Sequence, residues 1–402
     1  MKLKKHNHIE LIALAMLLLC FNSCVESFEY ESKDFEKLII INAVITDEVK
    51  QQEVHITNTT PIDEHYVSPE TNATVIVKDD SQNQYTFTEI EPGKYMSQSS
   101  FGALEGNKYS LHVQTSNGRK YYSKQVSLIS NKKPVSIIPK RIVNDDGIIG
   151  VDLLANSYDE TNNSKYYKYE YEESYKIIAP LWVLQDLVPN PNTPSGVTYH
   201  LYAKETEQET CYSTVNSNAI IQTNTINLTE DRVEDFSVRF IPITDMMIAH
   251  RYSILVKQYV QSRDAYAYYE KIKESIEVPG NLFSQAQAGF VQGNMLSETN
   301  INENVIGFFE VSTVVSDRIF FNFEDVFEND TPPKYDCPKI APLIFEGIGD
   351  YPLVSFLTSG FKFLSLNDEN PGDDEGPFIL VPPACGDCTV LGNAEVPNFW
   401  IE

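Results

Sequence analysis

The sequence predicts a mainly β protein, in which an N-terminal β-sandwich precedes a larger antiparallel β-rich domain with one amphipathic helix. Three observations predict this class. The 402 residues include 23 tyrosines and 21 phenylalanines, and aromatic residues favour strands. Short apolar runs alternate with polar residues in period two, which indicates half-buried strands. One segment, residues 263–277, has the apolar spacing of an amphipathic helix.

Residues 1–23 have the pattern of a secretion signal. Lysines near the start precede an apolar run from Leu11 to Phe21, which is too short to span a bilayer. Ser23 then precedes Cys24, which resembles a bacterial lipobox, although Phe21 stands where leucine is usual. We expect cleavage before Cys24 and acylation of its sulfur, with plain secretion as the alternative.

The residues after Cys24 suggest where the chain is held. Residues 24–36 are polar and acidic, so they form a tether and not a core. Acidic residues directly after an acylated cysteine resemble the surface-export signal of Bacteroidota lipoproteins. Two acyl groups give durable anchoring, and no later segment has the ~18 uninterrupted apolar residues of a span. We therefore expect a lipid-anchored outer-membrane protein that faces the cell exterior.

The composition of the mature chain is strongly acidic. From residue 24 onward it has 28 basic and 56 acidic residues. Nucleic acid is therefore excluded as a partner, because binding it requires clustered lysine and arginine. The acidity indicates a soluble, self-repelling surface, with capture of cations or basic ligands as the alternative. About 380 residues exceed one ordinary core, so two domains are expected.

Residues 37–135 are expected to form the first domain. The run KLIIINAVI is β-branched, and Ala73, Val75 and Val77 fall on one face of a strand. Asn117-Gly118 is a strong hairpin signal. Six or seven strands within ~100 residues predict a small antiparallel sandwich. The glycine, tyrosine and serine residues at its turn edges resemble those of transthyretin-like and carboxypeptidase-regulatory-like modules, which bind more often than they catalyse.

Residues 136–402 are expected to form the second domain, and ISNKKPVSIIPK, with two prolines, marks the boundary. Tyr167, Tyr169 and Tyr171 alternate with charged residues, as in a strand with one buried side. Ser262 is a good N-cap for the helix, which Val278-Pro279-Gly280 would end. The apolar stripe of this helix comprises Ala265, Tyr269, Ile272 and Ile276.

Four cysteines besides Cys24 remain in the mature chain, namely Cys211, Cys337, Cys385 and Cys388. An even number in an exported protein favours disulfides. A four-thiolate zinc site would show two closely spaced pairs, and a redox couple would lie near a βαβ pattern, but both roles remain alternatives. Three pairings are possible. We favour one bond from Cys337 to a member of the Cys385/Cys388 pair and one from Cys211 to the other.

Several blocks of the sequence resemble the domain of unknown function 4249 family, lipoproteins of Bacteroidota. They include CYSTVNSNAIIQTNTINLTED, YSILVKQYVQSRDAYAYYEKIKES, GNMLSETNINENVIGFFEVSTVVSDRIFF and CGDCTVLGNAEVPNFW. Tyr212 and Asn398 depart from the pattern, which more often has tryptophan and aspartate. The resemblance implies an immunoglobulin-like or transthyretin-like N-terminal domain and a gene neighbourhood with TonB-dependent outer-membrane receptors. It implies no catalytic residue.

The sequence lacks the common motifs for catalysis and cofactor binding. His55, His65, His112, His200 and His250 are dispersed, and the sequence has no HExxH, GxSxG, P-loop or GxGxxG. We therefore expect no enzyme activity, no cofactor and no metal centre. The acidic loop 367–377, NDENPGDDEGP, could hold calcium through oxygen ligands, but a flexible acidic loop is the preferred interpretation.

The segment IIAPLWVLQDLVPNPNTPSG is predicted to be an exposed apolar loop. Trp182, Leu184 and Leu187 could anchor a partner there, although core packing of these side chains is the preferred interpretation. The leading hypothesis is a non-enzymatic surface lipoprotein that assists a TonB-dependent receptor in ligand capture or in building a surface complex. A free-standing adhesin or envelope scaffold is the first alternative, and a hydrolase with an unrecognised site is the second.

Overall fold

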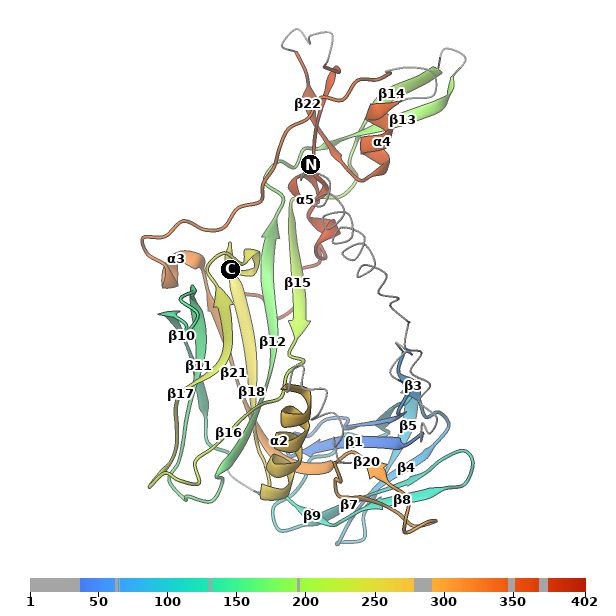
Figure 1. The fold of residues 1–402 in the computed structure, drawn as a ribbon, viewed down its shortest axis with the longest axis vertical. Helices are drawn as coiled ribbons and strands as arrows, with labels where there is room; N and C mark the ends of the chain where they lie inside the picture. Colours follow the sequence, from blue (N-terminus) through green and yellow to red (C-terminus); the bar gives the residue numbers. More distant parts are fainter. Residues whose placement is uncertain are drawn as a thin grey trace, which may run out of the picture.

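The computed structural model describes residues 37–61, 64, 66–129, 132–193, 196–277, 291–345, 351–368 and 375–402 (Figure 1). Within these residues the chain is mainly β, as predicted, and its one long helix is α2 (Arg263–Glu277). Figure 1 shows a lower sandwich, a middle sandwich and a small upper lobe along the longest axis. None of the helices in the described part is long and apolar enough to cross a membrane.

The lower sandwich contains most of the N-terminal strands. They are β1 (Ile39–Thr46), β2 (Glu53–Asn58), β3 (Ser68–Pro69), β4 (Thr74–Asp79), β5 (Gln84–Glu91), β6 (Lys94–Ser97), β7 (Lys108–Gln114), β8 (Lys120–Ser123) and β9 (Val126–Ser127). Alternate side chains point into one core, where Val75 and Val77 of β4 are fully buried. The predicted period-two strands are therefore confirmed here.

Later segments complete the core of the lower sandwich. β19 (Met295–Ser297) pairs antiparallel with β8, and β20 (Val305–Ile306) pairs parallel with β1. The first residues of β21 (Phe309–Phe321) also run parallel to β1. The buried side chains that these segments add to the core are Met295, Val305, Phe309 and Val311. Residues 37–135 thus share their core with residues more than 150 positions later.

The middle sandwich has two facing sheets. One is β10 (Val135–Val143), β11 (Ile149–Asp159) and β17 (Asp231–Pro242), and the other contains β12 (Tyr166–Ile178), β15 (Thr210–Asn216), β16 (Ile221–Asn224) and β18 (Tyr252–Val260). Tyr167 and Tyr169 are buried between the sheets, as the alternation in β12 predicts, but Lys168 on the other face is buried too, so the expectation of one buried side is wrong at this position. The second half of β21 pairs antiparallel with β18. A single sheet therefore runs through both sandwiches by way of β21.

Helix α2 lies against the lower part of this sheet (Figure 1). The Ala265 amide donates to the Ser262 hydroxyl at 3.1 Å, which confirms the predicted N-cap. Ala265 is fully buried, and Tyr269 and Ile272 pack in the same cluster beside Phe308. The residues expected to end the helix, 278–280, lie outside the described part of the chain.

The upper lobe is built from two hairpins and short helices. Its elements are β13 (Gln185–Thr193), β14 (Gly196–Ala203), α4 (Pro352–Thr358), β22 (Lys362–Leu366), β23 (Phe378–Val381), α5 (Pro383–Gly386) and the 3₁₀ helix η3 (Cys388–Val390). The prediction of a loop at residues 185–193 is wrong, because this segment is the first strand of a hairpin. Pro189 fits in β13 because, within the described residues, β13 pairs with β14 alone.

Two disulfides hold this lobe to the rest of the chain. Cys211 in β15 bonds Cys388, and Cys337 bonds Cys385, with Cα–Cα distances of 5.5 and 5.8 Å. This is the pairing that the sequence favours, with one bond from each distant cysteine to the Cys385/Cys388 pair. Because Cys385 and Cys388 lie on adjacent short helices, the two bonds fix that turn against both β15 and the segment around residue 337.

Candidate functional site

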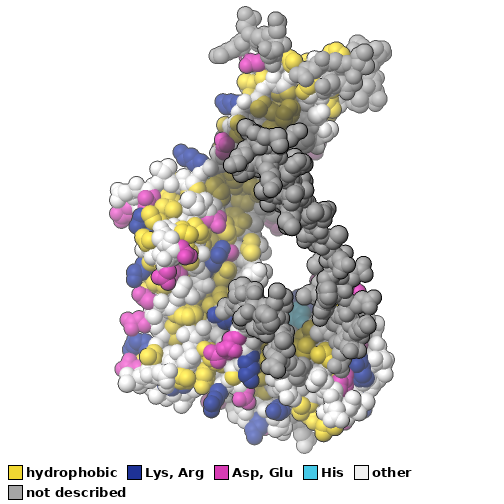
Figure 2. All heavy atoms as spheres, viewed as in Figure 1, with side chains coloured by type: hydrophobic (Ala, Val, Ile, Leu, Met, Phe, Trp, Pro, Cys, Tyr) yellow, Lys and Arg dark blue, Asp and Glu magenta, His cyan; other side chains and the backbone are white. Residues whose placement is uncertain are grey.

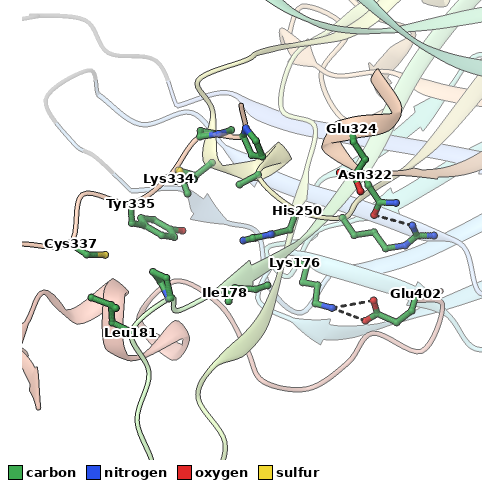
Figure 3. Close-up of a pocket in the computed structure, with 16 residues that line it drawn as sticks. Lys176, Ile178, Leu181, His250, Asn322, Glu324, Lys334, Tyr335, Cys337 and Glu402 are labelled. Atoms are coloured by element: carbon green, nitrogen blue, oxygen red, sulfur yellow. Dashed lines mark hydrogen bonds and ion pairs between the residues drawn. The ribbon is translucent and has the colours of Figure 1, made fainter. Parts of the chain in front are cut away.

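A cavity of about 630 Å³ lies where the middle sandwich meets the upper lobe (Figure 3). Five parts of the chain form it: the end of β12 with the residues after it, the 3₁₀ helix η1 (Met246–Ile248) with its link to β18, the start of α3 (Phe323–Val326), residues 332–337, and Glu402. Its lining residues are Lys176, Ile178, Pro180, Leu181, Met246, Ala249, His250, Arg251, Asn322, Glu324, Pro332, Pro333, Lys334, Tyr335, Cys337 and Glu402.

The local fold explains how these side chains come together. Lys176 and Ile178 are two residues apart in β12, so they share one face of the strand. The Lys176 amide donates to the Arg251 carbonyl at 3.0 Å, which aligns the end of β12 with the start of β18. At the end of β21, the Asn322 amide donates to the Asp325 carboxylate at 2.7 Å, which caps the start of α3.

One end of the cavity is apolar. Figure 3 shows Leu181, Tyr335 and Cys337 at this end, with Lys334 beside Tyr335 and with Ile178 and His250 between them and Lys176, Glu324 and Glu402. The Leu181 amide donates to the Cys385 carbonyl at 2.8 Å, so the chain entering the upper lobe is tied to α5. The disulfide at Cys337 fixes the opposite wall to the same helix. The apolar end is therefore covalently braced.

The other end of the cavity is charged. Lys176 Nζ lies 3.1 Å from both side-chain carboxylate oxygens of Glu402. Arg251 Nη1 donates to the Asn322 side-chain oxygen at 3.2 Å, and Arg251 Nε donates to the Ile401 carbonyl. These contacts hold residues 401–402 at the rim of the cavity (Figure 3).

Two titratable side chains in the cavity favour their neutral forms. Burial lowers the pKa of His250 below its usual value, and the positive charge of Lys176 lowers it further, while Glu324 opposes the shift. Burial raises the pKa of Tyr335, and the neighbouring Tyr175 adds to the shift. At neutral pH the fixed charges of the lining are therefore the cations Lys176, Arg251 and Lys334 and the carboxylates Glu324 and Glu402.

The Glu402 carboxylate is suited to remain ionised. The hydrogen bond from Lys176 lowers the pKa of Glu402, and the charge of Lys176 acts in the same direction, although burial opposes both. A general acid in a hydrolase needs a carboxyl group whose pKa is raised. Glu402 therefore has the properties of a salt-bridged carboxylate and not those of a proton donor.

The structure separates the three apolar residues singled out in the sequence. Leu187 is 6% exposed in the core of the upper lobe, and Trp182 is half-buried against the cluster around Cys211 and Cys388, so these two side chains pack in cores and are not exposed anchors. The reason is that β13 turns Leu187 inward against α4 and β22. Leu184 lies on the outer face of the hairpin with 59% of its surface exposed.

Two other sites predicted from the sequence lie wholly or mostly outside the part of the chain that the structure describes. Cys24 and most of the acidic loop 367–377 lie outside the described residues. Within the described part, no group of three or more histidine, cysteine, aspartate or glutamate side chains could hold a metal ion. The sequence did not single out Lys176, Tyr335 or Glu402, because no local spacing links segments that are far apart along the chain.

Comparisons with known proteins give one informative result. Residues 25–318 match a protein-family model described as "Domain of unknown function (DUF4249)". The matched range ends within β21, so three of the four disulfide cysteines lie beyond it. No curated protein matches the chain. A solved structure titled "Biofilm associated protein - B domain" shares 8% identity over 69% of this chain and 85% of that chain, with a TM-score of 0.12, which carries no argument.

Proposed function

Because this chain belongs to the DUF4249 family, we propose that it is a non-enzymatic lipoprotein on the outer face of the outer membrane, where it captures a ligand for a TonB-dependent receptor. The observation that carries the binding role is the cavity at the top of the middle sandwich. Its volume of about 630 Å³ is typical of small-molecule sites, which combine apolar walls with a few polar groups.

Acylation of Cys24 would hold the protein beside its receptor. The lipobox-like Ser23-Cys24 and the acidic residues after it support this address. A tether of residues 24–36 would then raise the effective concentration of the lipoprotein at the receptor without a large interface. The proposed arrangement therefore needs only a modest contact surface.

We assign that contact to the outer face of the β13–β14 hairpin. Leu184, Val188 and Tyr202 are exposed on this face, at 59%, 43% and 56%. Figure 2 shows hydrophobic side chains gathered on the upper lobe, with acidic and basic side chains at its edge. The same face carries Asp186, which lies opposite Tyr202 and pairs with Lys204. Exposed apolar side chains beside polar groups mark interaction surfaces.

Co-purification tests the proposal. The full-length protein, extracted from its own outer membranes in mild detergent, is expected to bring a stoichiometric TonB-dependent barrel with it. The double variant Leu184→Ser/Tyr202→Ser should recover less of the barrel. Leu228→Ser is the matched control, since Leu228 is similarly exposed at 54% but lies in the turn before β17. Recovery of the membrane-bound protein without a barrel would contradict the proposal and favour the adhesin or scaffold.

A further inference from the structure

We propose that the cavity binds a molecule with an apolar body and a carboxylate head, and that the Glu402 side chain occupies the head position when no ligand is bound. This inference rests on the proposed ligand-capture function and names the class of ligand. Three features carry it: the charge of the lining, the contacts of Glu402 and the separation of charged and apolar ends.

The charge of the lining contrasts with that of the molecule. The whole chain has 57 acidic and 31 basic residues, yet the cavity is lined by three cations and two carboxylates. Lys176, Arg251 and Lys334 reach it from three separate segments. An excess of positive charge inside a recess attracts anions. A cationic ligand would be drawn instead to the acidic remainder of the surface.

Glu402 already shows how a carboxylate fits this end. Both of its oxygens lie 3.1 Å from Lys176 Nζ, and the Tyr212 hydroxyl lies 3.3 Å from one of them. Lys176 and Tyr212 are cross-strand neighbours on β12 and β15, so the sheet sets the positions of both groups. The Glu402 side chain is 64% exposed, and exposed ion pairs are weak. A ligand carboxylate can therefore displace it at little cost.

The apolar end suits a hydrocarbon or aromatic body. Leu181, Ile178 and Tyr335 line it, and His250 beside them favours its uncharged form. The Asn322 side-chain oxygen, at the charged end, already accepts from Arg251. A sugar would require hydrogen-bonding groups along its whole length, whereas here Lys176, Asn322 and Glu402 gather at one end and only Lys334 among the charged lining residues lies beside Tyr335 (Figure 3). The lining therefore fits an amphipathic carboxylate.

The test is calorimetric titration of the full-length chain in lipid nanodiscs, with empty nanodiscs as the blank. Octanoate is the probe, while 1-octanol and octylamine have the same body without the negative head. We expect saturable binding of octanoate and weaker binding of the other two. Equal binding of octanoate and 1-octanol would overturn the inference, and so would the absence of octanoate binding.

Two variants test where the carboxylate head of the ligand binds. Lys176→Met should weaken octanoate binding about tenfold, the scale of a lost hydrogen bond to a charged group. Glu402→Gln should strengthen it about threefold, because it removes a weak internal competitor. Lys120→Met, a change at an exposed lysine of β8, is the control and should bind as the parent does. Unchanged or weaker binding by Glu402→Gln would overturn the stand-in role even if Lys176→Met fails to fold.

The proposed ligand class and the proposed receptor partnership can be contradicted independently of each other. If octanoate does not bind but the barrel co-purifies, the ligand class is wrong and the receptor role stands. If octanoate binds but no barrel is recovered, the cavity is a ligand site in a protein that acts without that receptor.

Discussion

Arg239 in β17 and Glu173 in β12 form an ion pair between the two sheets of the middle sandwich. Arg239 makes two parallel hydrogen bonds to the Glu173 carboxylate, at 3.1 and 3.2 Å, and the Tyr252 hydroxyl donates to the same carboxylate at 2.7 Å. Only 3% of the Glu173 side chain is exposed. Loss of the arginine would therefore leave a buried negative charge without its partner.

We expect Arg239→Met to lower the free energy of unfolding by about 3–5 kcal/mol, the range for breaking a buried ion pair on one side. Arg232→Met is the matched control on the same strand, because Arg232 pairs with the exposed Glu230. It should cost less than about 1 kcal/mol. Urea denaturation measures the free energy of unfolding of both variants. Equal decreases would show that the buried Arg239–Glu173 pair stabilises the protein no more than an exposed pair does.

Asp159 makes the folding stability of the protein depend on pH. Burial alone would raise the pKa of Asp159, but hydrogen bonds from Thr161, Ser164 and Asn163 lower it below its usual value. A carboxyl group whose pKa is depressed by folding adds stability above its unfolded pKa of about 3.9. That contribution is lost as the pH falls from there through the lower, folded pKa.

The variant Asp159→Asn should therefore be less stable than the parent at pH 7, and the gap should narrow below about pH 4. Urea denaturation at a series of pH values from 7 to 3 measures this gap. A gap that stays constant with pH would mean that the charge of Asp159 does not stabilise the turn at residues 160–164.

For single residues, the sequence predicts which side chains are buried better than it predicts which side chains line the cavity. The alternation of tyrosines in β12 fixes which side chains face the core, because a strand has only two faces. The sequence cannot show that Lys176 meets Glu402, since 226 positions separate them and no local pattern records the contact. For Leu187 and Trp182 the sequence left both an exposed loop and core packing open, because their segment contains prolines that favour a loop.

Among the elements, the two disulfides brace the upper lobe in different ways. The Cys211–Cys388 bond joins residues 177 positions apart, and the Cys337–Cys385 bond joins residues 48 apart. A crosslink constrains the unfolded chain more strongly when the loop that it closes is longer. The longer bond should therefore contribute more to stability.

We expect Cys211→Ala/Cys388→Ala to lower the free energy of unfolding by about 5 kcal/mol and Cys337→Ala/Cys385→Ala by about 4 kcal/mol. Urea denaturation under oxidising conditions compares the two double variants. The reverse order would show that local packing, such as that of Trp182 on the Cys211–Cys388 cluster, or strain outweighs loop length.

The sequence predicts a secondary-structure element correctly where features close together in the chain determine it. Ser262 and the apolar spacing after it locate the start of α2, because an N-cap and an amphipathic stripe are both local features. The first strand of the β13–β14 hairpin was predicted to be a loop. That strand contains Pro189, which a sheet accepts at an unpaired edge, and edge position is a property of the tertiary fold.

Over the whole molecule, β21 joins the two sandwiches. It pairs parallel with β1 through Phe309 to Ser312, and then antiparallel with β18 through Thr313 to Phe321. The sequence predicts two successive domains because it shows a composition change near residue 135. It does not show that residues 291–312 return to the first sandwich, because parallel pairing over 266 positions leaves no local signal.

An isolated fragment of residues 37–135 should therefore lack a fixed tertiary structure, since its core lacks Phe309 and Val311. The same fragment joined by a flexible linker to residues 291–321 should recover it. Near-ultraviolet circular dichroism and amide hydrogen exchange compare the two. Cooperative unfolding of the shorter fragment alone would show that the first sandwich closes without β19 to β21.

The proposed role depends on the chain being carried out of the cell and held there by lipid. Mass spectrometry of the N-terminal peptide, from protein isolated from its own membranes, tests this most directly. We expect a chain that begins at Cys24 with acyl groups on that residue. A retained leader, or a start elsewhere without lipid, would contradict the anchored position and the receptor partnership that depends on it.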